Sequence, residues 1–155
     1  MVTDLTYELE ILQEARNKLL SVLHASSNDQ LTAIKKGYNN NILWNIGHIV
    51  CTQQLLCYRV FGHEINLDPE FIDSFRKGSV PNGEKELKHI PAIERELQYG
   101  VDELKQNLTS LSWNMETPYA TSFGITLNSI EEVVQFLLMH DGIHLGYIMA
   151  QKRIK

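Results

Sequence analysis

The sequence predicts an all-α protein, an antiparallel four-helix bundle with an extended insert before the last helix. Apolar residues recur at intervals of three and four in several long stretches, which is typical of amphipathic helices. The chain has 155 residues, a length that suits one domain covering residues 1–155. It contains no internal repeat and no linker where a second domain would begin. Four long helices and one insert are most economically packed as a bundle.

The first half of the chain predicts two long helices. Leucines at helical spacing predict the first over residues 5–24, and the polar run 25–30 follows it. One asparagine of the triplet 39–41 can cap the next helix, because its side chain accepts a hydrogen bond from a free backbone N–H of the first turn. We expect this second helix over residues 42–61, ended by Gly62.

Shorter elements and a third long helix are predicted next. Asp68 and Pro69 are typical of a cap followed by a first-turn proline, so a short helix is expected through residues 71–75. Residues 77–83 contain two glycines and a proline and predict a loop. The third long helix is expected over residues 89–108 from its apolar spacing.

A non-helical segment is predicted between the third and the fourth long helix. Residues 113–127 contain Thr, Tyr, Phe, Gly and Pro with weak alternation, which predicts an extended loop or a short hairpin. Ser129 and Glu132 have the spacing of a capping box. The fourth long helix is therefore expected from there to about Arg153.

Charge and cysteine usage limit the partners and the compartment. The net charge is −5, from 14 basic and 19 acidic residues. Such a chain has no general attraction for nucleic-acid phosphates or anionic lipids, so we expect neither nucleic acid nor a membrane as partner. Cys51 and Cys57 would point about 240° apart on one helix and should stay unpaired, which fits a reducing compartment. Residues 1–14 lack the features of a signal peptide, and we expect a cytoplasmic protein.

Three histidines fall on faces that are predicted to point into the core. His140 and His144 are four residues apart, which puts them about 6 Å apart on one helix face. Two helical histidines at this spacing can bind one metal ion. His48 lies on the inward stripe of the second helix. Three unpartnered core imidazoles would be unstable, and one divalent cation would satisfy one nitrogen on each, so a metal site is favoured over packed core histidines.

Helical glycines lie beside these histidines. Gly47 precedes His48, while Gly142 and Gly146 flank His144. A glycine inside a helix costs about 1 kcal/mol relative to alanine. The three together predict space that is kept for a close helix approach or for a ligand.

Catalytic groups are harder to identify than metal ligands. Asp141 occupies the position of the glutamate in H-E-x-x-H, where it could act as a base or orient a neighbouring imidazole. Tyr147 and Asn45 are further polar candidates beside the site. We expect Cys51 to be a packed thiol and no metal ligand. The E-x-x-H motif that ends at His89 has no second copy, which excludes a di-iron bundle site.

Two motifs give the chain a resemblance to a known family. Residues 41–49 read NILWNIGHI, and residues 140–146 read HDGIHLG. In these motifs, and in the order of its predicted helices, the chain resembles the DinB/YfiT-like superfamily of bacterial four-helix-bundle metalloenzymes. The resemblance implies a metal triad on His48, His140 and His144, a nickel or zinc ion, and a homodimer. It also implies chemistry that uses a low-molecular-weight thiol such as bacillithiol or mycothiol.

The leading hypothesis for function is a mononuclear metal-dependent enzyme that acts on a small molecule. Three neutral imidazoles leave an open position on the ion, as in catalytic sites. A thiol bound there would be held as thiolate, which predicts a thiol-dependent S-transferase. Metal-dependent hydrolysis is the enzymatic alternative, and a non-catalytic dimeric bundle that binds a metal or a small ligand is the other. Imidazole also accepts iron or manganese, so the residues alone leave the ion open.

Overall fold

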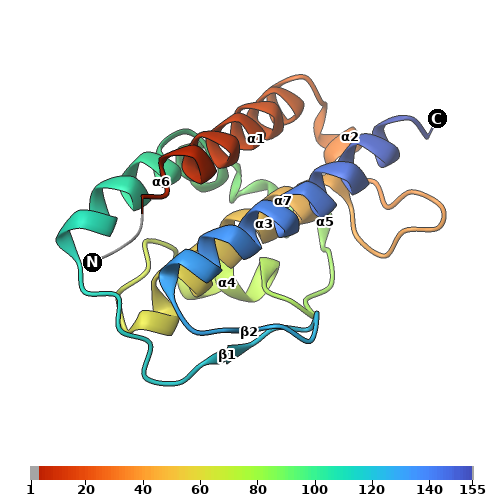
Figure 1. Cartoon of the computed structure of the whole chain (residues 1–155). Helices are drawn as coiled ribbons and strands as arrows, with labels where there is room; N and C mark the ends of the chain where they lie inside the picture. The colour runs from red at the N-terminus through yellow and green to blue at the C-terminus, as the bar shows by residue number, and fades with distance from the viewer. Residues whose placement is uncertain (1–3, 155) are drawn as a thin grey trace.

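Four long helices make up most of the chain in the computed structural model, which describes residues 4–154 (Figure 1). Residues 1–3 and 155, which the predicted domain includes, lie outside this range. The long helices are α1 (Thr6–His24), α3 (Ile42–Cys57), α6 (Ile90–Ser110) and α7 (Ile130–Lys152). The first of them, α1, packs against α6 and α7, and α3 packs against the same two helices. The predicted all-α class is confirmed.

Short elements connect the long helices. They are α2 (Asn28–Thr32), the 3-10 turn η1 (Arg59–Phe61), α4 (Pro69–Phe75), α5 (Gly83–Leu87) and the strands β1 (Tyr119–Ala120) and β2 (Thr126–Leu127). The two strands pair antiparallel, with Tyr119 opposite Leu127. Of the two forms predicted for residues 113–127, the structure therefore has the short hairpin.

The predicted caps form with one difference. Asn41, Asp68 and Ser129 each accept a hydrogen bond from the backbone N–H three residues further on. The capping box expected at the start of α7 is only half formed. In a full box the carboxylate of Glu132 would accept from the backbone N–H of Ser129. It accepts instead from the backbone N–H of Asn128.

One helix boundary differs from the prediction, and two short helices were not predicted. The helix expected over 42–61 ends at Cys57, and η1 with a left-handed Gly62 (φ 78°) completes the segment. The run 25–30 was predicted only as polar, yet Ser27 and Gln30 form a full capping box that starts α2. The helix α5 begins at residue 83, the last residue of the predicted loop over 77–83, and no helix was expected there.

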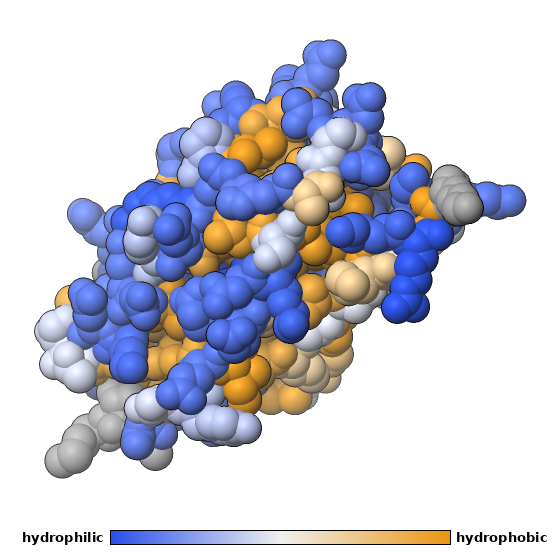
Figure 2. Space-filling view, turned by 90° about the horizontal axis from the view of Figure 1, so that it is seen from above, coloured by the Kyte–Doolittle hydropathy of each residue, from blue (hydrophilic) through white to orange (hydrophobic). Residues whose placement is uncertain are grey.

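The long helix α7 is apolar enough, and long enough, to cross a bilayer by length and composition alone over Ile130–Gln151. In this fold it packs against α3 and α1, and it carries His140, Asp141 and His144 in its buried or half-buried positions. Only 33% of this apolar stretch is buried, and its exposed positions include Met139, Ile143, Tyr147 and Met149. Seen from above, where α1 lies, the surface mixes hydrophilic residues with hydrophobic ones (Figure 2).

One buried ion pair joins α1 to α7. The guanidinium Nε of Arg16 donates to Oδ2 of Asp141 at 2.9 Å, and both side chains are 1% exposed. A charge buried this deeply is tolerated only with a partner, so each residue fixes the position of the other. The pair places Asp141 beside the histidines of α7.

Candidate metal centre

The three histidines predicted as ligands meet between α3 and α7. One nitrogen of each lies within 4.8 Å of the others, and among residues 4–154 they form the one such group of His, Cys, Asp or Glu side chains. The Nε2 atoms of His48 and His140 are 3.2 Å apart. His48 and His140 are buried, and His144 is half-buried. Because α3 and α7 pack directly against each other, residues 92 positions apart in the chain become neighbours.

The ring of His48 is fixed from two sides. Its Nδ1 donates to the backbone carbonyl of Phe75 at 2.7 Å, so its Nε2 carries the lone pair, and the Thr52 hydroxyl lies 3.4 Å from this atom. Trp44, one turn earlier on α3, stacks on the ring with centroids 4.7 Å apart and planes at 8°. Gly47 allows this arrangement, since a Cβ there would lie 2.3 Å from the ring of Phe75.

The orientation of His144 is set by Asn45. The Nδ1 of His144 donates to the amide oxygen of Asn45 at 2.8 Å. The amide nitrogen of Asn45 donates in turn to the backbone carbonyl of Asn41 at 2.8 Å, which fixes the direction of the amide. His144 therefore also keeps Nδ1 protonated and Nε2 free. Asn45 was predicted only as a polar neighbour, and the structure makes it the partner of a candidate ligand.

The third imidazole, His140, lies beside the buried ion pair. Its Nδ1 is 3.6 Å from Oδ1 of Asp141, and neither atom has a hydrogen-bond partner. The other oxygen of Asp141 is held by Arg16. Each of the three histidines thus has its own oxygen atom near Nδ1: the Phe75 carbonyl, the Asn45 amide and the Asp141 carboxylate.

These features fit a divalent metal ion. Histidines that bind a metal commonly donate their second ring N–H to a carbonyl or carboxylate, and this orients the ring and fixes its tautomer. The Nε2 atoms of His48 and His140, 3.2 Å apart, can share one proton in a hydrogen bond or bind one cation together. Burial, followed by the charge of His140, lowers the pKa of His48 to about 4. Burial also lowers the pKa of His144 to about 3, with His140 and His48 adding to the effect. Both imidazoles are therefore neutral at pH 7, as metal ligation requires.

We expect the metal-free protein to lose stability as the pH falls from 6.5 toward 4. In this range the unfolded chain protonates both histidines at their ordinary pKa of 6.5. In the folded chain the pKa is about 4 for His48 and about 3 for His144, so both imidazoles stay neutral until the pH reaches these lower values. The unfolded state then holds more protons, so acid favours unfolding. Urea unfolding across this pH range measures the effect. The double variant His48→Gln, His144→Gln should show a shallower pH dependence, and an unchanged slope would contradict the assignment.

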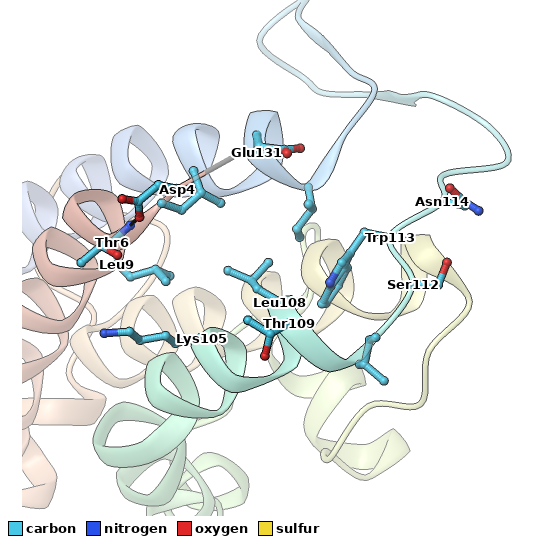
Figure 3. A pocket seen from close by; sticks show the side chains of 13 residues that line it. Asp4, Thr6, Leu9, Lys105, Leu108, Thr109, Ser112, Trp113, Asn114 and Glu131 are labelled. Atoms are coloured by element: carbon cyan, nitrogen blue, oxygen red, sulfur yellow. Dashed lines mark hydrogen bonds between the residues drawn. The ribbon is translucent and has the colours of Figure 1, made fainter. Parts of the chain in front are cut away.

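A cavity of about 360 Å³ opens beside the three histidines. Its walls come from α3, α7 and the segment 119–123 of the hairpin. A larger hollow of about 780 Å³ lies between α1, α6 and the start of α7 (Figure 3). The larger hollow is lined by neither histidine nor cysteine. The smaller cavity is therefore the candidate site, because the three histidines line it.

The two residues predicted as catalytic candidates lie outside this cavity. Asp141 is buried against Arg16 and does not line it. Tyr147 is 52% exposed, contacts Tyr38 edge-on, and also lies outside the lining. Cys51 is buried, and burial raises the pKa of its thiol to about 12, in agreement with the predicted packed thiol.

The prediction for the helical glycines holds for one of three. Gly47 provides the close approach between α3 and α4. Gly142 and Gly146 provide no close helix approach, because a Cβ on either would meet nothing within 4 Å, and neither lines the cavity beside the histidines. Both glycines lie on the exposed face of α7.

Arg16 was not predicted as a residue of the site region, although it holds Asp141 beside the histidines. It lies among Leu12, Leu19 and Leu23 on the buried face of α1. A single arginine on an apolar stripe is a signal for a buried acidic partner, since charges are rarely buried unpaired.

Comparison with known proteins agrees with this geometry. A family model described as the DinB superfamily matches residues 11–148. The matched span contains the three histidines together with Asn45 and Asp141. No curated protein matches the chain.

Proposed function

The chain belongs to the DinB superfamily, and from this membership and the site geometry we propose that it is a metal-dependent enzyme. His48, His140 and His144 would hold one divalent ion, with nickel or zinc favoured and iron or manganese also compatible with imidazole. The observation that carries the proposal is the hydrogen bonding of Nδ1 in His48 and His144, which leaves the lone pair of each ring on Nε2. The ring of contacts among the four long helices supports the predicted antiparallel four-helix bundle, with the hairpin as its insert.

We propose thiol transfer to an electrophile as the reaction. When bound, the ion would supply a Lewis acid that lowers the pKa of a thiol. The reacting thiol must come from outside the chain, because burial raises the pKa of both Cys51 and Cys57 to about 12. A cavity of about 360 Å³ suits a small molecule. The resemblance to relatives that use low-molecular-weight thiols supports the same substrate class.

The chain's own residues would prepare the site for this chemistry. The Phe75 carbonyl and the Asn45 amide hold two imidazoles in fixed orientations, so their rings need no reordering when a ligand arrives. Trp44 covers the face of His48, and the hairpin segment 119–123 forms a wall of the cavity. These contacts reduce the access of water to the site.

We expect His140→Ala to lose bound metal and the stabilisation that metal brings. A ligand that binds only the folded state raises its stability, so wild-type protein should melt at a higher temperature with metal than after chelation. This difference should disappear in the variant. His24→Ala is the matched control, because His24 is exposed on α1 and pairs with Glu94, and neither residue lines the cavity. Unchanged metal content and unchanged melting temperature in His140→Ala would overturn the metal proposal.

The reaction is tested on metal-loaded protein with several thiols and a chromogenic electrophile. We expect a rate above that of the free thiol, and its loss in His140→Ala. A site that binds metal but accelerates none of these reactions would point to a non-catalytic metal-binding bundle.

A further inference from the structure

The cavity beside the histidines has an unusual charge for this chain. The sequence holds 19 acidic and 14 basic residues, yet the lining contains no aspartate and no glutamate. Its one formal charge is Lys77. The remaining polar side chains are neutral hydrogen-bonding groups: Asn40, Thr52, Tyr119, Thr121 and Ser122. The wall of this cavity therefore favours an anion over a cation.

The position of Lys77 is tied to the candidate metal centre. It follows Phe75, the last residue of α4, by two positions, and the carbonyl of Phe75 holds His48. Lys77 is exposed and forms no ion pair within residues 4–154. Lys77 lines the same cavity as His48, His140 and His144. Among the described residues no carboxylate pairs with Lys77, so its ammonium group is available to a ligand of this cavity.

Part of the cavity lining is apolar. Leu55 and Leu56 of α3 and Phe136 of α7 contribute to it. Phe123, from the turn of the hairpin, packs edge-on against Phe136 with ring centroids 6.1 Å apart. A ligand that fills this space needs a small apolar body as well as a charged end.

We propose that the cavity binds a small carboxylate-bearing molecule, with the carboxylate paired to Lys77 and an apolar body against Phe123 and Phe136. The inference rests on the proposed function and names its substrate class: at least one of the two reactants, thiol or electrophile, carries a carboxylate. A cation held by the histidines would add to the positive potential of the cavity. The contact with Lys77 is partly exposed, so the preference is moderate and weakens with salt.

Intrinsic fluorescence provides a direct readout of binding. The chain has two tryptophans, and Trp44 lines the cavity while Trp113 does not. The variant Trp113→Phe therefore isolates the signal of Trp44. Zinc-loaded protein of this background is titrated with 3-mercaptopropionate and with its methyl ester, which differ in charge and share the thiol. Calorimetry repeats each titration, and zinc content is measured in every sample.

We expect the acid to bind about three- to fivefold more tightly than the ester. Lys77→Gln should bring this ratio to about one, and high salt should reduce it in the parent protein. Lys77→Arg should preserve the preference, and so should Lys18→Gln, a control on α1 that lines no cavity described above. Equal binding of acid and ester, a preference that survives Lys77→Gln, or no binding by either method would overturn the inference.

Failure of this inference is distinguishable from failure of the proposed function. Full zinc content without a carboxylate preference would refute only the substrate class. Failure to bind any of zinc, nickel, iron and manganese would refute the metal-dependent function. A Lys77-dependent preference for the acid in such metal-free protein would still support the carboxylate site.

Discussion

Replacing Arg16 with methionine is expected to lower the free energy of unfolding by about 3–5 kcal/mol. Arg16 and Asp141 are each 1% exposed and 2.9 Å apart. Methionine keeps an unbranched apolar stem in the core but leaves the carboxylate of Asp141 buried without its cation. Urea unfolding followed by circular dichroism measures the change.

Two further variants separate this effect from a loss of packing. Arg76→Met removes an ion pair whose partners are 56% and 75% exposed, and it should change stability by no more than about 1 kcal/mol. The double variant Arg16→Met, Asp141→Leu removes both buried charges and should recover most of the lost stability. A small effect of Arg16→Met alone would show that Asp141 tolerates isolation.

The same double variant tests whether Asp141 positions His140. We expect it to bind metal about 10–100-fold more weakly than wild-type protein, although its stability is restored. A purely structural role for the ion pair would leave the metal affinity unchanged once stability is recovered.

Gly47→Ala is expected to destabilise the protein by about 1–3 kcal/mol, although alanine is the better helix former. The added Cβ would lie 2.3 Å from a ring carbon of Phe75, which is fully buried. To relieve the clash, Phe75 must move, and its carbonyl holds Nδ1 of His48. We therefore expect metal affinity to fall together with stability.

The other glycines of the site region provide matched controls. Gly142→Ala and Gly146→Ala place a methyl group in open space on α7. Each should raise stability by up to about 1 kcal/mol through helix propensity alone. Adding Phe75→Leu to Gly47→Ala makes room for the methyl group and should recover part of the loss. Equal gains for all three alanine variants would show that Gly47 has no packing role.

Much of the fold could be predicted because local signals dominate it. Leucine spacing and the caps at Asn41, Asp68 and Ser129 place three of the long or short helices close to their observed starts. The short helix α5 was not predicted, because the residues before it are rich in glycine, proline and polar side chains, which also form loops. The capping box of Ser27 and Gln30 was readable in the sequence and was overlooked.

The ligands of the candidate site could be predicted, but most of their partners could not. His140 and His144 are related by helical spacing, and His48 faces them once α3 packs on α7. The partner of His48 is a backbone carbonyl, and because every residue has one, the sequence does not show which residue provides it. Lys77 reaches the cavity through the turn after α4, and no periodic pattern places a residue in such a turn.

Elemental analysis of untagged protein, purified without added metal, tests the three-histidine centre most directly. His48→Ala is analysed in parallel, with its folding confirmed by circular dichroism. We predict close to one divalent metal ion per wild-type chain and none in the variant. Wild-type protein that contains no metal, and takes up none when zinc, nickel, iron or manganese is supplied, would contradict the metal centre and the function proposed from it.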